Sequence, residues 1–462
     1  MIVRDKQLID GGITPVFLMG CIKEHEARAN EMQTLYNAYN SKPPILSRTM
    51  TEGLPNNKLV HNYARYIVAI SSGYLVGEPV TYQSDTEDIE ALVGAYKYTR
   101  IPHVDSELAK NAALYGKGVE LCYANNEARV QSVSLDPRNA FVVYENNVLY
   151  TPILGFYSYS IIGDDGKTAG VEIQVYDDTS VYTYRGKDRE GALSKQPDIK
   201  PHYFGGLPMI EYWNNDDETG DFEHVMTLID AYDLLQSDRI NDKQQLVQAI
   251  LVMTGARMES EPDKYDEKGE IVARGRTAAQ QIREDKMIFL PDQDATAHYL
   301  TKNLVESDVE ILRDSLKADI HKFSMVPDLS DENFSSNASG VAMRYKLFGL
   351  EQMTKTKERW FEEALRERLG LYANFLSLKG AKHIDTDNVQ IIFKRALPVN
   401  ESEIAQMIAT LRDMVPEEIL MAQLPFIEDA AGAKETLDVE REQAIQRQQR
   451  AFGMPVEDKF EG

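Results

Sequence analysis

Residues able to do chemistry are present in this 462-residue chain, but they do not stand at the spacings that catalytic motifs require. Neither G-x-G-x-x-G nor G-x-x-x-x-G-K-[ST], whose backbone amides cradle phosphates, occurs. The H-E-x-x-H zinc motif, a C-x-x-C pair and the G-x-S-x-G nucleophile turn are also missing, and the eight histidines do not pair at metal-ligand spacing. The sequence therefore predicts no enzyme, no metal and no cofactor.

Clustered carboxylates are the remaining candidates for acid–base or metal chemistry. The Asp-Asp pairs at 177–178 and 216–217 stand in turn-like sequence, where aspartate is favoured because its side chain bonds to nearby backbone amides. Asp328, Asp331 and Glu332 form a third cluster, which lacks the D-x-[DN]-x-[DN]-G order of a calcium loop. Turn formation explains the pairs better than catalysis does, and a cation at the third cluster is the weaker alternative.

Charge and composition narrow the class of protein. The chain carries 50 basic and 74 acidic residues, a net charge of −24, which argues against a DNA-coating protein because phosphate affinity comes from Lys and Arg. It has no apolar run of about 18 residues for a membrane span and no secretory signal at its start. Two distant cysteines indicate a reducing compartment, in keeping with synthesis in a cytoplasm.

The hydrophobic periodicity predicts an α+β fold with several long helices. Helices are expected over 24–40, 57–72, 103–115, 221–251, 303–323, 339–377 and from about 399 onward. Strands are expected over 119–123, 171–175, 181–184, 251–255, 287–291 and 389–393. Glycine and proline set the breaks between them, with Gly73 ending the second helix and Gly380 the long one.

The helix expected over 221–251 changes character along its length. Its first half carries an apolar stripe, whereas its second half, QSDRINDKQQ, is almost wholly polar. Such a helix either projects into solvent or packs against polar partners, and we expect it to leave the main body. The small unit at 252–302 would then lie between this helix and the one at 303–323, at the end of a projecting pair.

Four segments, in this order along the chain, resemble the portal proteins of long-tailed phages that infect Gram-positive bacteria. They are NKLVHNYARYIVAISSGYLVGEPV (57–80), LYGKGVELCYANNEARVQSVSLDPRNAFVVY (114–144), FEHVMTLIDAYDLLQSD (222–238) and VPDLSDENFSSNASGVAMRYKLFGLEQ (326–352). The last is the strongest match, since in that family a loop of Pro, Asp, Asn and small residues precedes an Asn-Ala-Ser-Gly-x-Ala motif that opens a long helix.

The resemblance implies a portal-type fold with named parts. Residues 1–220 would form the first part of a mixed α/β wing, 221–251 and 303–325 a two-helix stem, 252–302 a small α/β clip, 326–338 a tunnel loop, 339–395 the long tunnel-side helix and the wing return strand, and 396–462 a helical crown and tail. The small unit expected at 252–302, between two projecting helices, agrees with this layout.

The same resemblance implies a function and partners. The chain would form a ring of about twelve copies at one capsid vertex of a virion, made in the host bacterial cytoplasm. The ring would be a passive channel for double-stranded DNA in packaging and ejection. It would dock the terminase, which carries the motor's chemistry, and later a head-completion or adaptor protein and the tail, beside major capsid and scaffold proteins.

Ten residues are implied to face the DNA channel. They are Asp328, Asp331, Glu332, Asn333, Phe334, Ser335, Ser336 and Asn337 in the tunnel loop, with Arg344 and Lys346 in the helix that follows. Acidic and small polar groups repel phosphate rather than grip it, whereas the two cations would offer brief phosphate contacts at a second level. Asn337 or Ser339 is placed to cap that helix.

Three other classes remain as alternatives. One is a ring-forming or scaffold-type phage structural protein without a DNA channel, against which the loop-plus-helix motif argues. Another is an enzyme with an unfamiliar site, of the ADP-ribosyl-transfer or nuclease type, for which no extra domain is visible. A third, a membrane-surface protein, is opposed by the acidic balance, which disfavours anionic lipid.

Overall fold

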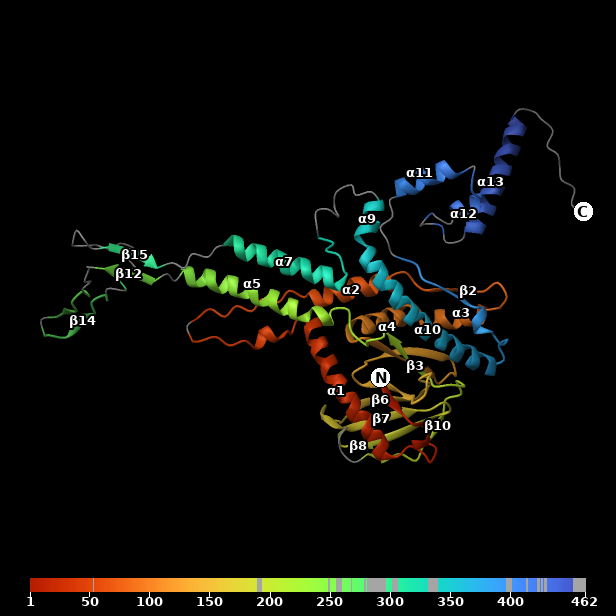
Figure 1. The fold of residues 1–462 in the computed structure, drawn as a ribbon, viewed down its shortest axis with the longest axis horizontal. Helices are drawn as coiled ribbons and strands as arrows, with labels where there is room; N and C mark the ends of the chain where they lie inside the picture. Colours follow the sequence, from red (N-terminus) through yellow and green to blue (C-terminus); the bar gives the residue numbers. More distant parts are fainter. Residues whose placement is uncertain are drawn as a thin grey trace, which may run out of the picture. The chain divides into compact units, whose positions relative to one another are not determined.

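The computed structural model describes residues 1–52, 54–188, 193–247, 250–254, 260–266, 268–277, 280, 296–300, 306–330, 340–395, 401–412, 414–421, 424, 427 and 430–451. The chain divides into two compact units. Unit 1 comprises Met1–Tyr36, Arg65–His224 and His321–Gly462, and unit 2 comprises Asn37–Ala64 and Val225–Ile320. Each contains helices and strands, so the chain is of the mixed α/β class that the sequence predicts (Figure 1).

The largest sheet of unit 1 has seven strands in the order β1-β5-β6-β7-β8-β10, with β9 paired to β8. β1 is parallel to β5 and the other neighbours are antiparallel. Helix α1 buries Leu18, Cys21 and Ile22 against strand residues such as Phe156 and Ile173. The elements are β1 (Ile2–Arg4), η1 (Lys6–Leu8), α1 (Pro15–Tyr39), β5 (Ala140–Glu145), β6 (Pro152–Ile162), β7 (Thr168–Tyr176), β8 (Ser180–Gly186), β9 (Ser194–Lys195) and β10 (Lys200–Pro201).

A second sheet of unit 1, in the order β11-β3-β4, packs against the helices α3, α4 and α10. The apolar stripe of α10, with Leu365, Leu369 and Tyr372, packs here with buried residues of α3 and α4. A two-stranded sheet joins β16 to β2. The elements are α2 (Tyr63–Val76), β2 (Thr81–Gln83), α3 (Glu90–Thr99), α4 (Ile101–Tyr115), β3 (Lys117–Ala124), β4 (Val130–Leu135), β11 (Met209–Trp213), η3 (Glu223–Val225), α9 (Gly340–Lys346), α10 (Phe348–Leu378), η4 (Thr386–Asn388) and β16 (Gln390–Ile392).

The carboxyl-terminal part of the chain is helical, as expected. Its elements are α11 (Glu401–Leu411), α12 (Glu417–Met421) and α13 (Ala430–Ala451). Arg441 of α13 forms ion pairs with Glu417 of α12, at 2.7 and 2.9 Å. Because both side chains are substantially exposed, this contact adds little to stability.

Within its described residues, unit 2 contains two long helices and two small sheets. Figure 1 shows α5 and α7 side by side, and Arg239 and Lys243 of α5 both pair with Glu306 at the start of α7, the lysine at 3.2 Å. β12 pairs antiparallel with β15, and β13 with β14. The elements are η2 (Pro44–Ser47), α5 (Met226–Val247), β12 (Ile250–Thr254), β13 (Lys264–Tyr265), β14 (Ile271–Ala273), β15 (Thr296–Leu300) and α7 (Glu306–Ser324).

The polar half of α5 has a structural cause. Asp233, Ser237 and Asn241 lie four residues apart on one face and are almost fully buried. Their oxygens accept hydrogen bonds from the backbone amides of His61, Leu59 and Asn57, at 2.8, 2.9 and 2.7 Å. This helix face packs against an extended backbone, which needs acceptors rather than apolar side chains.

Several predicted helix boundaries are wrong. The helix expected over 24–40 begins at Pro15, and the helix expected over 339–377 is divided into α9 and α10. Two further boundaries differ for physical reasons. The helix expected over 57–72 begins only at Tyr63, because residues 57–61 donate their amides to α5, and it continues through Gly73 to Val76. The helix expected from 221 begins at Met226 after a 3-10 turn, since the Asp221 side chain is held in a buried cross-link. The strand predicted at 287–291 lies outside the described residues. The expected strands do not include β15 or most strands of the seven-stranded sheet, of which only β7 and β8 match expected strands.

Candidate functional site

Only part of the predicted channel segment lies within the described structure. Asp328 does, and so do Arg344 and Lys346 on α9. The described chain stops at Ser330 and resumes at Gly340. Seven of the predicted residues fall outside it: Asp331, Glu332, Asn333, Phe334, Ser335, Ser336 and Asn337.

The entry of the loop is fastened to α2 by one hydroxyl group. The Tyr66 hydroxyl donates to the carbonyl oxygen of Pro327 at 2.8 Å and accepts from the amide of Leu329 at 3.0 Å. Both bonds go to backbone two residues apart, so they fix the direction in which the chain leaves α7. Tyr66 lies within the helix expected over 57–72, and its sequence pattern does not indicate this role.

A histidine at the end of α7 completes the anchor. His321 Nδ1 donates to the carbonyl oxygen of Val326 at 2.9 Å, and its ring meets that of Tyr66 edge to face at 5.7 Å between centroids. The other ring nitrogen, Nε2, lies 4.0 Å from Asp328 Oδ2. Asp328 Oδ1 in turn accepts from the amide and hydroxyl of Ser330, at 3.0 and 2.6 Å.

Asp328 therefore has a local structural task. Its side chain closes an aspartate turn, in which a carboxylate takes the place of a backbone acceptor. No group of three His, Cys, Asp or Glu residues in the described ranges is arranged to hold a metal ion. The contacts of Asp328 therefore fix the backbone conformation at the start of the loop.

The exit of the loop carries exposed cations. Arg344 and Lys346 lie in the last turn of α9 with exposed side chains, and Tyr345 between them is 79% exposed. Cations near a helix carboxyl end are stabilised by the helix dipole. Leu347 and Leu350 beyond them are buried, which anchors the start of α10.

A buried cross-link joins α2 to α10, the two helices beside the loop. Asp221, 4% exposed, accepts from Lys357 Nζ at 2.6 Å and also bonds the Ser71 hydroxyl. Its other oxygen accepts from the Asn214 amide group at 2.8 Å. A buried charge pair of this kind holds a specific geometry, because removal of either partner leaves the other charge buried without a counter-ion.

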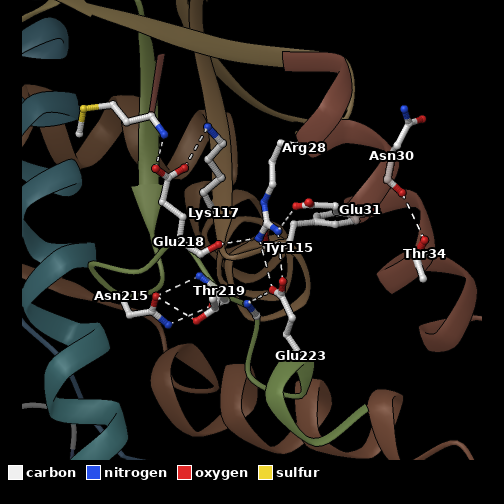
Figure 2. A network of polar contacts seen from close by, with 12 residues as sticks. Arg28, Asn30, Glu31, Thr34, Tyr115, Lys117, Asn215, Glu218, Thr219 and Glu223 are labelled. Atoms are coloured by element: carbon white, nitrogen blue, oxygen red, sulfur yellow. Dashed lines mark hydrogen bonds and ion pairs between the residues drawn. The ribbon is translucent and has the colours of Figure 1, made fainter. Parts of the chain in front are cut away.

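Figure 2 shows a second polar network, around Arg28 of α1. The Arg28 guanidinium donates to Glu223 at 3.1 Å and to the carbonyl oxygen of Glu218 at 2.7 Å. Lys117 lies 3.8 Å from the Glu218 carboxylate and 2.8 Å from that of Glu211. These contacts hold residues 215–223 against the turn between α4 and β3.

The charged residues of unit 1 thus fasten helices, turns and strands to each other. Within the part of the chain that the structure describes, none of the helices is long and apolar enough to cross a membrane. The buried pairs Lys357–Asp221 and Lys117–Glu211 fix the relative positions of the elements that carry them.

Comparison with known proteins identifies the family. The chain belongs to the phage portal proteins of the SPP1 Gp6-like type, whose family model matches residues 19–447. It is 24% identical to the portal protein of Bacillus phage SPP1 over 417 residues, which cover 85% of this chain and 78% of that protein. It is 20% identical to the portal protein of Clostridium phage phiCD119 over 439 residues, covering 89% and 93%.

The family assignment confirms the resemblance drawn from the four segments. The family is structural rather than enzymatic, and its members are head–tail connectors that sit in the virion at a capsid vertex. They form ring-shaped oligomers that interact with capsid, terminase and DNA and serve as the head portal for DNA packaging.

Proposed function

We propose that this chain assembles into a ring of about twelve copies around a passive channel for double-stranded DNA. DNA enters through it during packaging and leaves through it during ejection. The same ring docks the terminase, and afterwards a head-completion or adaptor protein and the tail. It contacts the major capsid and scaffold proteins at the vertex.

The parts of the portal are assigned by residue range. The wing comprises 1–220 with 339–395, the stem 221–251 and 303–325, the clip 252–302, the tunnel loop 326–338, and the crown and tail 396–462. The pairing of β12 with β15 carries this proposal, because it joins the end of α5 to the start of α7 across more than forty residues. Two ion-paired helices with a small β unit between them are what a stem and clip require.

The charge of the tunnel loop supports passive sliding. Its residues include Asp328, Asp331 and Glu332 and no Lys or Arg, and twelve copies would carry a formal charge of 12 × −24. An acidic bore repels phosphate, so the polyanion passes without a deep binding minimum. Arg344 and Lys346 would supply weak contacts beside it, and the Tyr66 anchor would keep the loop entry in place.

A charge reversal tests the loop assignment. The double variant Asp331→Lys/Glu332→Lys should lower the amount of nuclease-protected DNA in heads, because lysines would hold phosphates and slow passage. The matched control is Asp216→Lys/Asp217→Lys, which reverses the same charge in an exposed turn of unit 1. Normal packaging by the loop variant would contradict the assignment of residues 326–338 to the channel.

Native mass spectrometry with negative-stain imaging tests the ring itself. The expected particle has about twelve copies and a central hole. A closed dimer or tetramer without a hole would contradict the proposal.

A further inference from the structure

A small aromatic and acidic cavity in unit 1 has no role in the contacts described so far. Its volume is about 280 Å³, below the usual range for drug-sized ligands and suited to a group the size of one side chain. Tyr144, Trp213 and Trp360 line it, with Trp213 stacked on Trp360 at 6.1 Å between centroids. These are the two tryptophans of the chain.

Three carboxylates line the same cavity and differ in their hydrogen bonds and ion pairs. Glu211 is fully buried and bonded to Lys117 Nζ at 2.8 Å, the Val142 amide at 3.0 Å and the Tyr144 hydroxyl at 3.1 Å. Glu363 and Glu367, one turn apart on α10, make no ion pair or hydrogen bond with any residue in the described ranges. Both residues are exposed, so the cavity presents two solvated carboxylates without a described partner beside aromatic rings.

The protonation behaviour of Glu367 agrees with this lack of a partner. Glu367 is exposed, but the protein packed around it partly desolvates its carboxyl, and this desolvation, followed by the neighbouring charges of Glu363 and Glu211, raises the pKa of Glu367 to about 7. A cation placed in the cavity would relieve this repulsion. The cavity lining also includes Leu149, 85% exposed, and Tyr150, 48% exposed. Both offer apolar surface for the alkyl part of an organic cation.

We propose that this cavity is a binding site for an organic cation, an alkylguanidinium or alkylammonium group, held between the tryptophan faces and the carboxylates of Glu363 and Glu367. A cation is attracted to the face of an aromatic ring, most strongly to tryptophan, and carboxylates add charge-assisted hydrogen bonds. The cavity is too small for a nucleotide. The inference does not depend on the assignment of the channel loop.

Intrinsic fluorescence reads this site directly, because both tryptophans line it. The full chain is titrated with acetylarginine amide and, as the uncharged isostere, acetylcitrulline amide. The arginine probe should change the emission saturably, and Glu367→Gln should weaken it about fivefold or more. Glu362→Gln, on the same helix but paired with Arg366 at 2.7 Å, is the matched control and should bind as the wild type does.

Equal responses to both probes, or unchanged affinity in Glu367→Gln, would overturn the proposal. An equal loss in Glu362→Gln would also overturn it, because the effect would then be a general one of charge. A dilution series without probe identifies the natural source. Emission that changes as the ring assembles, with competition by the arginine probe, indicates a side chain of a neighbouring copy. Emission that is independent of concentration shows that no neighbouring copy fills the cavity, and saturable binding of the arginine probe then assigns the site to a free amine or guanidine.

Discussion

Arg368 of α10 and Glu120 of β3 form a fully buried ion pair, in which Arg368 Nε lies 2.9 Å from each carboxylate oxygen. Arg368 Nη1 also donates to Asp105 of α4 at 2.6 Å, and the Tyr212 hydroxyl donates to Glu120 at 2.6 Å. Burial raises the pKa of Asp105 to about 6, although Arg368 opposes the shift. One guanidinium thus joins a helix, a strand and a second helix at the centre of unit 1.

Replacing this arginine should be far more costly than replacing its exposed neighbour. Arg368→Met leaves Glu120 and Asp105 buried without a cation, which costs about 3–5 kcal/mol in comparable sites. Arg366→Met removes only an exposed pair with Glu362 and should cost less than about 1 kcal/mol. Urea unfolding of the full chain measures both. Similar midpoints for the two variants would show that the buried cluster does not hold the core.

The helix α10 shows where sequence reasoning succeeds and fails. Leu365, Leu369 and Tyr372 recur at helical spacing, which predicts a helix with one apolar face, and all three are buried. Arg368 interrupts that face with a charge, and its partner Glu120 is 248 positions away. No local pattern announces such a pair. The same limit applies to Tyr66, whose periodicity predicts burial but not the backbone groups of 327–329 that it binds.

Gly116 and Gly380 have nearly the same positive φ angle, so a comparison of the two distinguishes backbone strain from steric overlap. Gly116 has φ +90°, and a Cβ there would overlap the backbone of Glu218, whereas Gly380 has φ +92° and open space around it. Gly380→Ala should cost about 1–2 kcal/mol from the left-handed conformation alone. Gly116→Ala should cost clearly more, because residues 218–219 must also move. Thermal unfolding compares the two, and equal losses would mean that the segment adjusts freely.

The Tyr66 anchor should be measurable at a single amide. Tyr66→Phe removes the acceptor of the Leu329 amide and the donor to Pro327, at about 1 kcal/mol for each hydrogen bond. Hydrogen exchange at Leu329 should then accelerate about fivefold. Tyr345→Phe is the control, since Tyr345 is 79% exposed and lies beyond the loop. An unchanged exchange rate in Tyr66→Phe would show that the loop entry is held by other contacts.

The raised pKa of Glu367 predicts that tryptophan emission depends on pH near neutrality. The carboxyl beside Trp213 and Trp360 should titrate with a midpoint at about 7, and the transition should vanish in Glu367→Gln. The folded chain binds this proton more tightly than an unfolded chain, whose glutamate titrates near 4.5. The contribution of Glu367 to folding stability is therefore greatest below about pH 4.5 and is lost as the pH rises through 7. Acetylarginine amide, which favours the charged carboxylate, should move the emission midpoint to lower pH. If the probe bound but the emission midpoint stayed fixed, Glu367 would not be part of the binding site.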